Sequence, residues 1–151
     1  MKLFFDNCTS PVLADTLGGY VRHLGHTAYH ISTLPCGRHA ADLVWIEMLS
    51  READWIVLTA DKRISRNKAE RAAYRQAGLL GFALAPGFQK MPTHRVAAAL
   101  VGRWPDMAQL MSLVATSGLY EIPVGGGGFR PLPLRSPALP ERCPRRPPNL
   151  P

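Results

Sequence analysis

Short runs of apolar residues alternate along the chain with segments in which an apolar residue returns every three or four positions. The runs are bounded by Gly, Pro or acidic residues, as buried strands are, and the repeats are typical of helices that bury one face. The predicted strands cover residues 3–5, 26–31, 55–59, 79–84 and 119–124. The predicted helices cover residues 12–24, 40–53, 65–77, 93–103 and 105–117.

Strands and helices that alternate in this rhythm predict a parallel sheet with right-handed crossovers. We therefore expect the α/β class, with three layers (α/β/α) around a small, mostly parallel sheet of about four to five strands. The clearest strand is the continuous, β-rich run WIVLT at 55–59. The chain of 151 residues is long enough for one domain with a core and too short for two.

The composition changes abruptly at the four glycines of residues 125–128. Nine prolines fall between Pro123 and Pro151, among scattered arginines and with almost no apolar periodicity. Such a segment cannot bury a core. We therefore expect a folded domain over residues 1–124, followed by a disordered Gly/Pro/Arg-rich tail over residues 125–151 that is dispensable for folding.

The formal net charge of +7 is concentrated near the end of the chain. From Phe129 onward five arginines stand against one glutamate, a net charge of +4 that leaves +3 for the rest. Residues 1–128 are therefore only mildly basic. A basic balance favours an encounter with polyanions.

The sequence predicts a cytoplasmic protein without a disulfide framework. A run of only three apolar residues precedes Asp6, fewer than a signal peptide needs, and no run approaches the roughly 18 apolar residues of a membrane helix. The three cysteines are odd in number and widely spaced, which does not support disulfides. Cys36 and His39 have a zinc-like spacing but no second close pair, so a loop thiol beside a surface imidazole is the favoured interpretation.

Three aspartates stand where the predicted sheet would bring them to one edge. Asp6 ends the first strand, Asp61 follows the third, and Asp42 opens the helix that leads into the third. Ligands bind at the carboxyl ends of parallel strands. Unpaired carboxylates gathered there repel one another, and a divalent cation relieves that repulsion. Oxygen ligands suit Mg²⁺ or Mn²⁺, which can activate water for phosphodiester cleavage.

Two of these acids also have simpler explanations when taken alone. Asp42 suits the first turn of a helix, where the helix dipole favours an acid. Asp61 suits the turn that follows a strand. Asp6 needs neither a cap nor a turn. The occurrence of all three together is what favours a metal site.

Three segments of the chain resemble the PIN-like domains, in particular the compact group related to the VapC toxins of bacterial toxin–antitoxin loci. They are FFDN at 4–7, ADLVWI at 41–46 and IVLTAD at 56–61, within a similarity that covers residues 1–84. The resemblance implies a metal-dependent ribonuclease in which Asp6, Asp42 and Asp61 hold Mg²⁺ or Mn²⁺ and carry catalysis. Asn7 and Thr59 support the site. The resemblance also implies RNA as substrate and a cognate antitoxin as partner, and it leaves a homodimer open.

Full-length PIN nucleases usually carry a further acid on a helix between the first strand and the later aspartates. Between residues 7 and 38 the chain has only Asp15, inside the first predicted helix. Either the compact group does without this ligand, or Glu47 or Glu70 replaces it. On an ideal helix Glu47 lies about 140° around the axis from Asp42, so the two cannot easily face one metal.

A row of cations begins directly after Asp61 and continues to residue 75. A cationic rim beside a metal site suits the phosphate backbone of RNA, although a solvated helix face explains any single residue there slightly better. Lys62 and Arg63 are our candidates for RNA contact because they are closest to the acid. Trp45 and Trp55 are expected in the core.

Other functions fit the sequence less well. A haloacid-dehalogenase-type phosphatase needs a second aspartate two residues after the first, where this chain has Cys8, and a phosphoacceptor receiver domain needs an early acidic pair. Cys8 has no histidine placed to activate it as a nucleophile. The main alternative is a PIN-like protein without turnover that binds an antitoxin or RNA. DNA cleavage would use the same chemistry as RNA cleavage.

Overall fold

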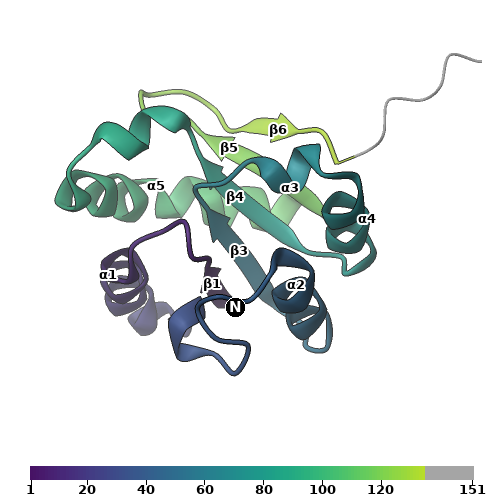
Figure 1. The fold of residues 1–151 in the computed structure, drawn as a ribbon. Helices are drawn as coiled ribbons and strands as arrows, with labels where there is room; N and C mark the ends of the chain where they lie inside the picture. The colour runs from purple at the N-terminus through teal and green to yellow at the C-terminus, as the bar shows by residue number, and fades with distance from the viewer. Residues whose placement is uncertain (135–151) are drawn as a thin grey trace, which may run out of the picture.

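A six-stranded sheet runs through the middle of the molecule in the computed structural model, which describes residues 1–134 (Figure 1). The strand order is β2-β1-β3-β4-β5-β6, in which the first five strands are parallel and β6 is antiparallel to β5. The strands are β1 (Lys2–Phe5), β2 (Thr27–His30), β3 (Trp55–Thr59), β4 (Leu80–Leu84), β5 (Gly118–Ile122) and β6 (Arg130–Leu132). The predicted α/β class is confirmed, with one strand more than the largest number expected.

Helices cover both faces of the sheet and complete the three predicted layers (Figure 1). On one face lie α1 (Pro11–Val21) and α5 (Thr93–Leu113). On the other lie α2 (Asp42–Ser50), α3 (Arg63–Arg66) and α4 (Lys68–Gln76). Short 3-10 helices, η1 (Arg22–Leu24), η2 (Ile31–Thr33) and η3 (Pro86–Lys90), lie in the connections.

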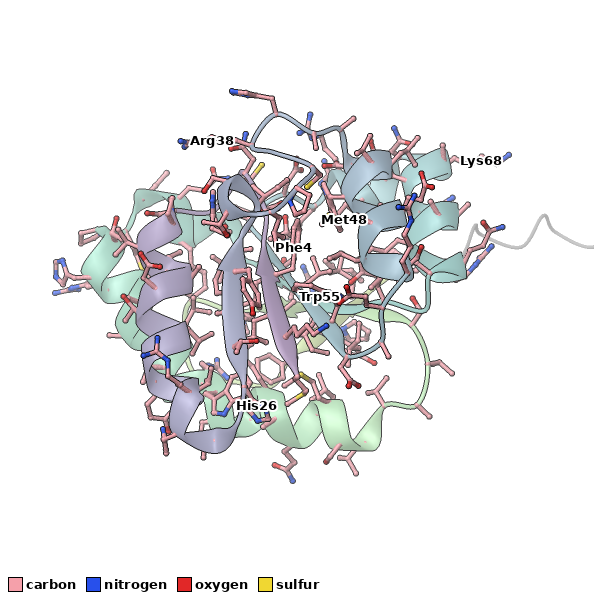
Figure 2. All side chains as sticks on the ribbon, turned by 90° about the horizontal axis from the view of Figure 1, so that it is seen from below. Phe4, His26, Arg38, Met48, Trp55 and Lys68 are labelled. Atoms are coloured by element: carbon pink, nitrogen blue, oxygen red, sulfur yellow. The ribbon has the colours of Figure 1, made fainter. Side chains whose placement is uncertain are left out.

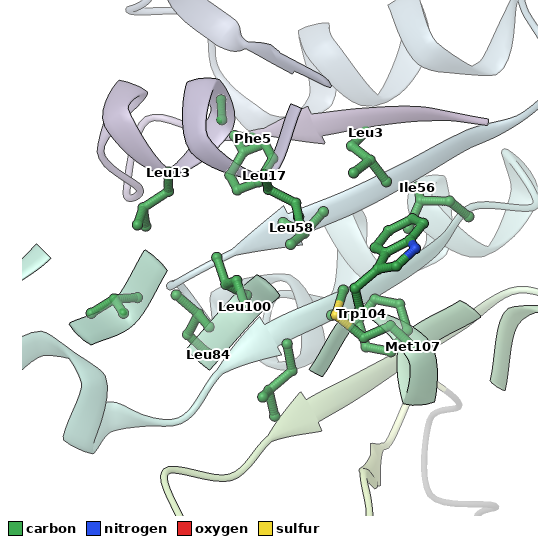
Figure 3. Close-up of a cluster of buried hydrophobic side chains, with 14 of the residues drawn as sticks. Leu3, Phe5, Leu13, Leu17, Ile56, Leu58, Leu84, Leu100, Trp104 and Met107 are labelled. Carbon is green, nitrogen blue, oxygen red and sulfur yellow. The ribbon is translucent and has the colours of Figure 1, made fainter. Parts of the chain in front are cut away.

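The central strands divide their side chains between two apolar cores, because successive residues of a strand point to opposite faces. Leu3 and Phe5 pack with α1 and α5, as Figure 3 shows, whereas Phe4 packs on the α2 side. There the ring of Phe4 lies 4.7 Å from that of Trp45, centroid to centroid. Trp45 is buried as predicted, and Trp55 is half-buried.

Two predicted helices differ from those in the structure, and each difference has a local cause. The single helix expected over residues 65–77 is broken at Asn67, whose extended backbone and side chain cap α4 by accepting from the N–H groups of Ala69 and Glu70. Conversely, residues 93–113 form one helix that runs through Pro105. Its buried face is continuous across the proline, with Trp104 on one side and Met107 on the other. None of the helices among residues 1–134 is long and apolar enough to cross a bilayer.

The predicted boundary at residue 124 ends the folded part too early. Residues 130–132 form β6, and beside it the ring of Phe129 packs on that of Phe82 at 5.3 Å between centroids. Leu134 is buried. Three strand residues between glycines and prolines are too few for a recognisable period, which is why the pattern missed them. The rest of the predicted tail, residues 135–151, lies outside the described residues, so its disorder stays a prediction.

Candidate active site

Asp6 directly follows β1 and is the most deeply buried acid of the predicted site, with 5% of its surface exposed. It lies on the side of the sheet that α2 and α4 cover. The Thr59 hydroxyl donates a hydrogen bond to its Oδ2, and the Cys8 backbone N–H donates to its Oδ1 at 3.1 Å. The same Thr59 oxygen accepts the backbone N–H of Asp61 at 2.9 Å. Thr59 therefore links the two aspartates, and the supporting role expected of it stays a prediction.

Burial raises the pKa of Asp6 to about 7. The negative charges of Asp42 and Asp61 add to this rise, and the hydrogen bonds from Thr59 and Cys8 oppose it. The carboxyl group therefore keeps its proton to a much higher pH than an exposed aspartate does. A cation bound beside it would favour the charged form.

Asp42 and Asp61 lie at the same edge, and each bonds to a protein donor. Asp42 is the first residue of α2, and its Oδ1 accepts from the indole N–H of Trp45 at 3.0 Å. Asp61 lies in the turn after β3, where its Oδ1 accepts the backbone N–H of Arg63 at 2.8 Å and its Oδ2 pairs with the Arg63 guanidinium. The Cys8 Sγ lies 3.8 Å from the same Oδ2.

Of the two candidates for a fourth acid, Glu70 lies at the site and Glu47 does not. Glu70, in the first turn of α4, lines the same cleft as Asp6 and Asp42. Burial, followed by the charges of Asp42 and Asp61, raises its pKa. Its Oε2 is buried and has no hydrogen-bond partner among residues 1–134. Glu47 is exposed and pairs with Arg51 at 3.0 Å.

The cleft lined by Asp6, Asp42 and Glu70 has a volume of about 270 Å³ and lies at the carboxyl end of β1. Asp61 lies beside it, where it contacts the lining residues Cys8 and Arg63. Asn7 also lines the cleft. Asn7 Oδ1 accepts from the Arg38 side chain at 3.2 Å, which ties the loop after β1 to the loop before α2. Figure 2 shows Arg38 at this end of the sheet and His26, which precedes β2, at the opposite end.

The donor set of the cleft fits a hard divalent cation, because it offers buried carboxylate oxygens, one of them unpaired. As the side chains stand, however, no three acidic, His or Cys side chains within residues 1–134 lie close enough together to coordinate one ion. Each aspartate bonds to a protein donor, and the Arg63 guanidinium lies on Oδ2 of Asp61. Binding an ion at that oxygen therefore requires Arg63 to leave it. The same finding leaves the Cys36 and His39 pair without the further ligands that zinc needs.

The two predicted RNA contacts, Lys62 and Arg63, point in different directions. Arg63 is exposed at the cleft. The Lys62 ammonium pairs instead with Glu121 of β5, and Arg130 of β6 pairs with the other oxygen of Glu121 at 2.9 Å. Lys62 therefore ties the loop after β3 to the far edge of the sheet, and its contact with RNA stays a prediction.

Two further polar residues support the site and were not identified from the sequence. Glu121 is buried, and a charge inside the predicted strand 119–124 was the available signal. His30 is buried at the end of β2, where its Nε2 lies 3.0 Å from the Thr9 carbonyl oxygen. It holds the loop that follows Asp6. The sequence did not predict this contact, because His30 stands alone in a weakly patterned strand.

Cys8 lies between Asp6 and Asp61, in surroundings that disfavour its thiolate. Burial and the two negative charges raise the pKa of its thiol to about 11. A thiolate is therefore strongly disfavoured at neutral pH. This agrees with the sequence, which offers no activating base.

A mostly parallel sheet with acidic side chains around a cleft at its carboxyl edge defines the chain as an α/β domain with an acidic site. The family model of the PIN like domain matches residues 1–86, more than half of the chain, and the chain belongs to this family. All four acids lie within that range. PIN-like domains are generally nucleases and typically use Mg²⁺ or Mn²⁺. No curated protein and no solved structure matches the chain. The narrower VapC-related grouping stays a prediction.

Proposed function

We propose that this protein is a metal-dependent endoribonuclease. The observation that carries the proposal is the convergence of three carboxylates on one cleft, those of Asp6, Asp42 and Glu70. Asp61 lies beside it, near enough for its charge to raise the pKa of Asp6 and of Glu70. Asp6 is buried there with a raised pKa, and Glu70 has a buried oxygen without a partner among the described residues. Groups placed in this way are costly in an isolated protein and are stabilised by a bound cation.

Each side chain of the cleft has a role in this proposal. Asp6, Asp42, Asp61 and Glu70 hold Mg²⁺ or Mn²⁺, which when bound activates water and stabilises negative charge on the phosphate. Thr59 orients Asp6 through its hydroxyl and Asp61 through its backbone N–H. Arg63, released from Asp61, is placed to contact the phosphate backbone.

The biological setting that we propose rests on the resemblance of the three motif segments. It is that of a cytoplasmic toxin whose cognate antitoxin blocks the cleft. The basic character of the chain supports RNA as the polyanion.

A second candidate function is a PIN-like protein that binds RNA or an antitoxin without turnover. The specific observation in its favour is that all three aspartates are already bonded to protein donors, with Arg63 on Asp61. With its aspartates bonded to protein donors, the domain keeps its fold and its binding surface without a bound metal.

The experiment that separates the two titrates Mn²⁺ and Mg²⁺ into wild type, Asp61→Asn and the matched control Asp15→Asn. Asp15 is an exposed acid on α1. Thermal stability and RNA cleavage are read in the same samples, with EDTA as the reversal. Metal stabilisation and cleavage in wild type and Asp15→Asn, both lost in Asp61→Asn, are the expected results. The absence of any metal response in all three proteins would favour the binding protein, and cleavage that survives EDTA would exclude the metal mechanism.

A further inference from the structure

A second hollow opens on the other side of Cys8 from the acidic cleft. It has a volume of about 210 Å³, and because Cys8 lines both hollows they are direct neighbours. Its walls are mainly apolar side chains, namely Leu13, Ala60, Leu84, Phe88, Met91 and Val96.

The position of this hollow follows from the alternation of side chains at the end of β3. Thr59 and Asp61 face the acidic cleft on the α2 and α4 side of the sheet, and Ala60 between them faces the hollow on the α1 and α5 side. The same carboxyl edge therefore carries two different surfaces. The edge of the sheet separates the two surfaces, and Cys8 lines both of them.

The chemistry of the two surfaces is opposite. Every side chain that lines the hollow is uncharged, whereas the cleft carries carboxylates and the Arg63 guanidinium. Of the polar residues in the hollow, Ser10 already accepts from the Val12 N–H at 3.3 Å, and Thr9 donates to the Asp6 carbonyl at 2.7 Å. The exposed side chains of Gln89 and Thr93 make no hydrogen bond with another residue of the range 1–134.

We propose that this hollow is a base-recognition subsite, which takes one nucleobase of a single-stranded RNA while a neighbouring phosphate lies at the acidic cleft. This inference rests on the proposed ribonuclease function. An uncharged apolar hollow with a free amide and hydroxyl at its rim suits a flat heteroaromatic ring with a polar edge. It does not suit a phosphate. Its volume is below that of pockets for drug-sized ligands, which fits one base and not a base pair.

The recognition follows from the residue types. The faces of the base pack against Phe88, Met91 and Val96, as bases pack on apolar platforms in other single-strand binders. The amide of Gln89 offers both a donor and an acceptor to the polar edge of the base, so it can distinguish one base from another. The hydroxyl of Thr93 can adapt to either.

A direct test uses the full chain without added metal and the four ribonucleosides as probes, with ribose as the probe that lacks a base. Protein NMR should show saturable shift changes over residues 88–96 with at least one nucleoside and none with ribose. Thr93→Trp, which fills the mouth of the hollow, should abolish these changes. Thr16→Trp, at an exposed threonine of α1 outside the hollow, should leave them intact.

A second measurement reads the base preference of cleavage in a randomised RNA. Gln89→Ala should weaken the preference for one base at a single position beside the cut by roughly fivefold or more, as loss of a base-edge contact does. Gln76→Ala, an exposed glutamine of α4 outside the hollow, should keep the wild-type preference.

The outcomes separate this inference from the proposed function. Nucleoside binding in the hollow without RNA cleavage would support the base subsite and reject the ribonuclease. Cleavage with no nucleoside shifts in the hollow and an unchanged preference in Gln89→Ala would overturn the base subsite and leave the ribonuclease standing. Shifts confined to the acidic cleft would overturn the subsite as well.

Discussion

Asp6 is a residue whose surroundings strongly disfavour its own charge. In an unfolded chain an aspartate titrates near pH 4, whereas in the folded protein burial raises the pKa of Asp6 to about 7. Between these two values the folded state holds a proton that the unfolded state has lost. The stability that neutral Asp6 contributes is therefore fully present below pH 4 and is lost as the pH rises through 7.

We therefore expect the free energy of unfolding of the metal-free protein to fall between pH 5 and pH 8, by on the order of 2–4 kcal/mol. Asp6→Asn should flatten this dependence and be more stable than wild type at pH 8, because it removes the buried charge. Urea unfolding in EDTA at several pH values measures both effects. Asp15→Asn should keep the wild-type slope. If the slope persisted in Asp6→Asn, another group would be its source.

Arg63 is the second residue that affects metal binding at the cleft. Its guanidinium lies on Oδ2 of Asp61, an oxygen that a metal would use. We expect Arg63→Ala to tighten Mn²⁺ binding by a few-fold, because it frees the Asp61 oxygen from an exposed ion pair, and to weaken RNA binding. Lys68→Ala removes an exposed charge of α4 and serves as control. Calorimetry with Mn²⁺ and RNA binding to metal-free protein separate the two effects. Unchanged Mn²⁺ affinity would mean that Arg63 does not compete with the ion.

At the scale of single elements, α1 contains adjacent glycines that differ in their surroundings. A Cβ on Gly19 would meet nothing within 4 Å, whereas a Cβ on Gly18 would lie 3.1 Å from the Cβ of Ala28 in β2. Gly18 therefore permits the close approach of α1 to the edge of the sheet.

Gly19→Ala should stabilise the protein by about 0.5–1 kcal/mol, because alanine loses less backbone entropy in a helix. Gly18→Ala should show no such gain, since the crowding against Ala28 offsets it. Chemical denaturation of the two variants side by side checks this. Equal gains in both would show that α1 can move away from β2 at no cost.

The elements also show where sequence reasoning succeeds and where it fails. The positions of three aspartates could be predicted because each stands at one end of a clear apolar pattern, namely Asp6, Asp42 and Asp61. The end of a predicted strand or helix indicates at which edge of the sheet the aspartate lies. Glu70 could be named only as an alternative, because its position depends on Asn67 ending one helix and capping the next. The strand β6 could not be predicted, because three residues are too few to show a pattern. It is defined by its pairing with β5, which the sequence does not reveal.

At the scale of the whole molecule, β6 and the charge of the chain end can be tested together. β6 covers one edge of the sheet, and Arg130 with Lys62 neutralises the buried Glu121. Residues 135–151 carry four arginines and one glutamate, a net charge of +3.

A chain truncated after Leu134 should keep the wild-type melting temperature and bind RNA more weakly, with a shallower dependence on salt. A chain truncated after Gly125 should in addition be less stable by on the order of 2 kcal/mol or more, because Glu121 loses a partner and β5 becomes an open edge. Thermal melting and RNA binding at two salt concentrations distinguish the two truncations. Equal stability would show that β6 contributes nothing to the fold.

The strand order also has a consequence for synthesis on the ribosome. From β1 outward, β3, β4, β5 and β6 are added in the order in which they leave the ribosome, and only β2 is added on the opposite side. The four acids are all translated by residue 70, whereas α5, which shelters the apolar face of α1, is complete only at residue 113. The nascent chain therefore carries the acidic residues of the cleft while half of its core is still open, and that interval is when a chaperone or a partner would find it most exposed.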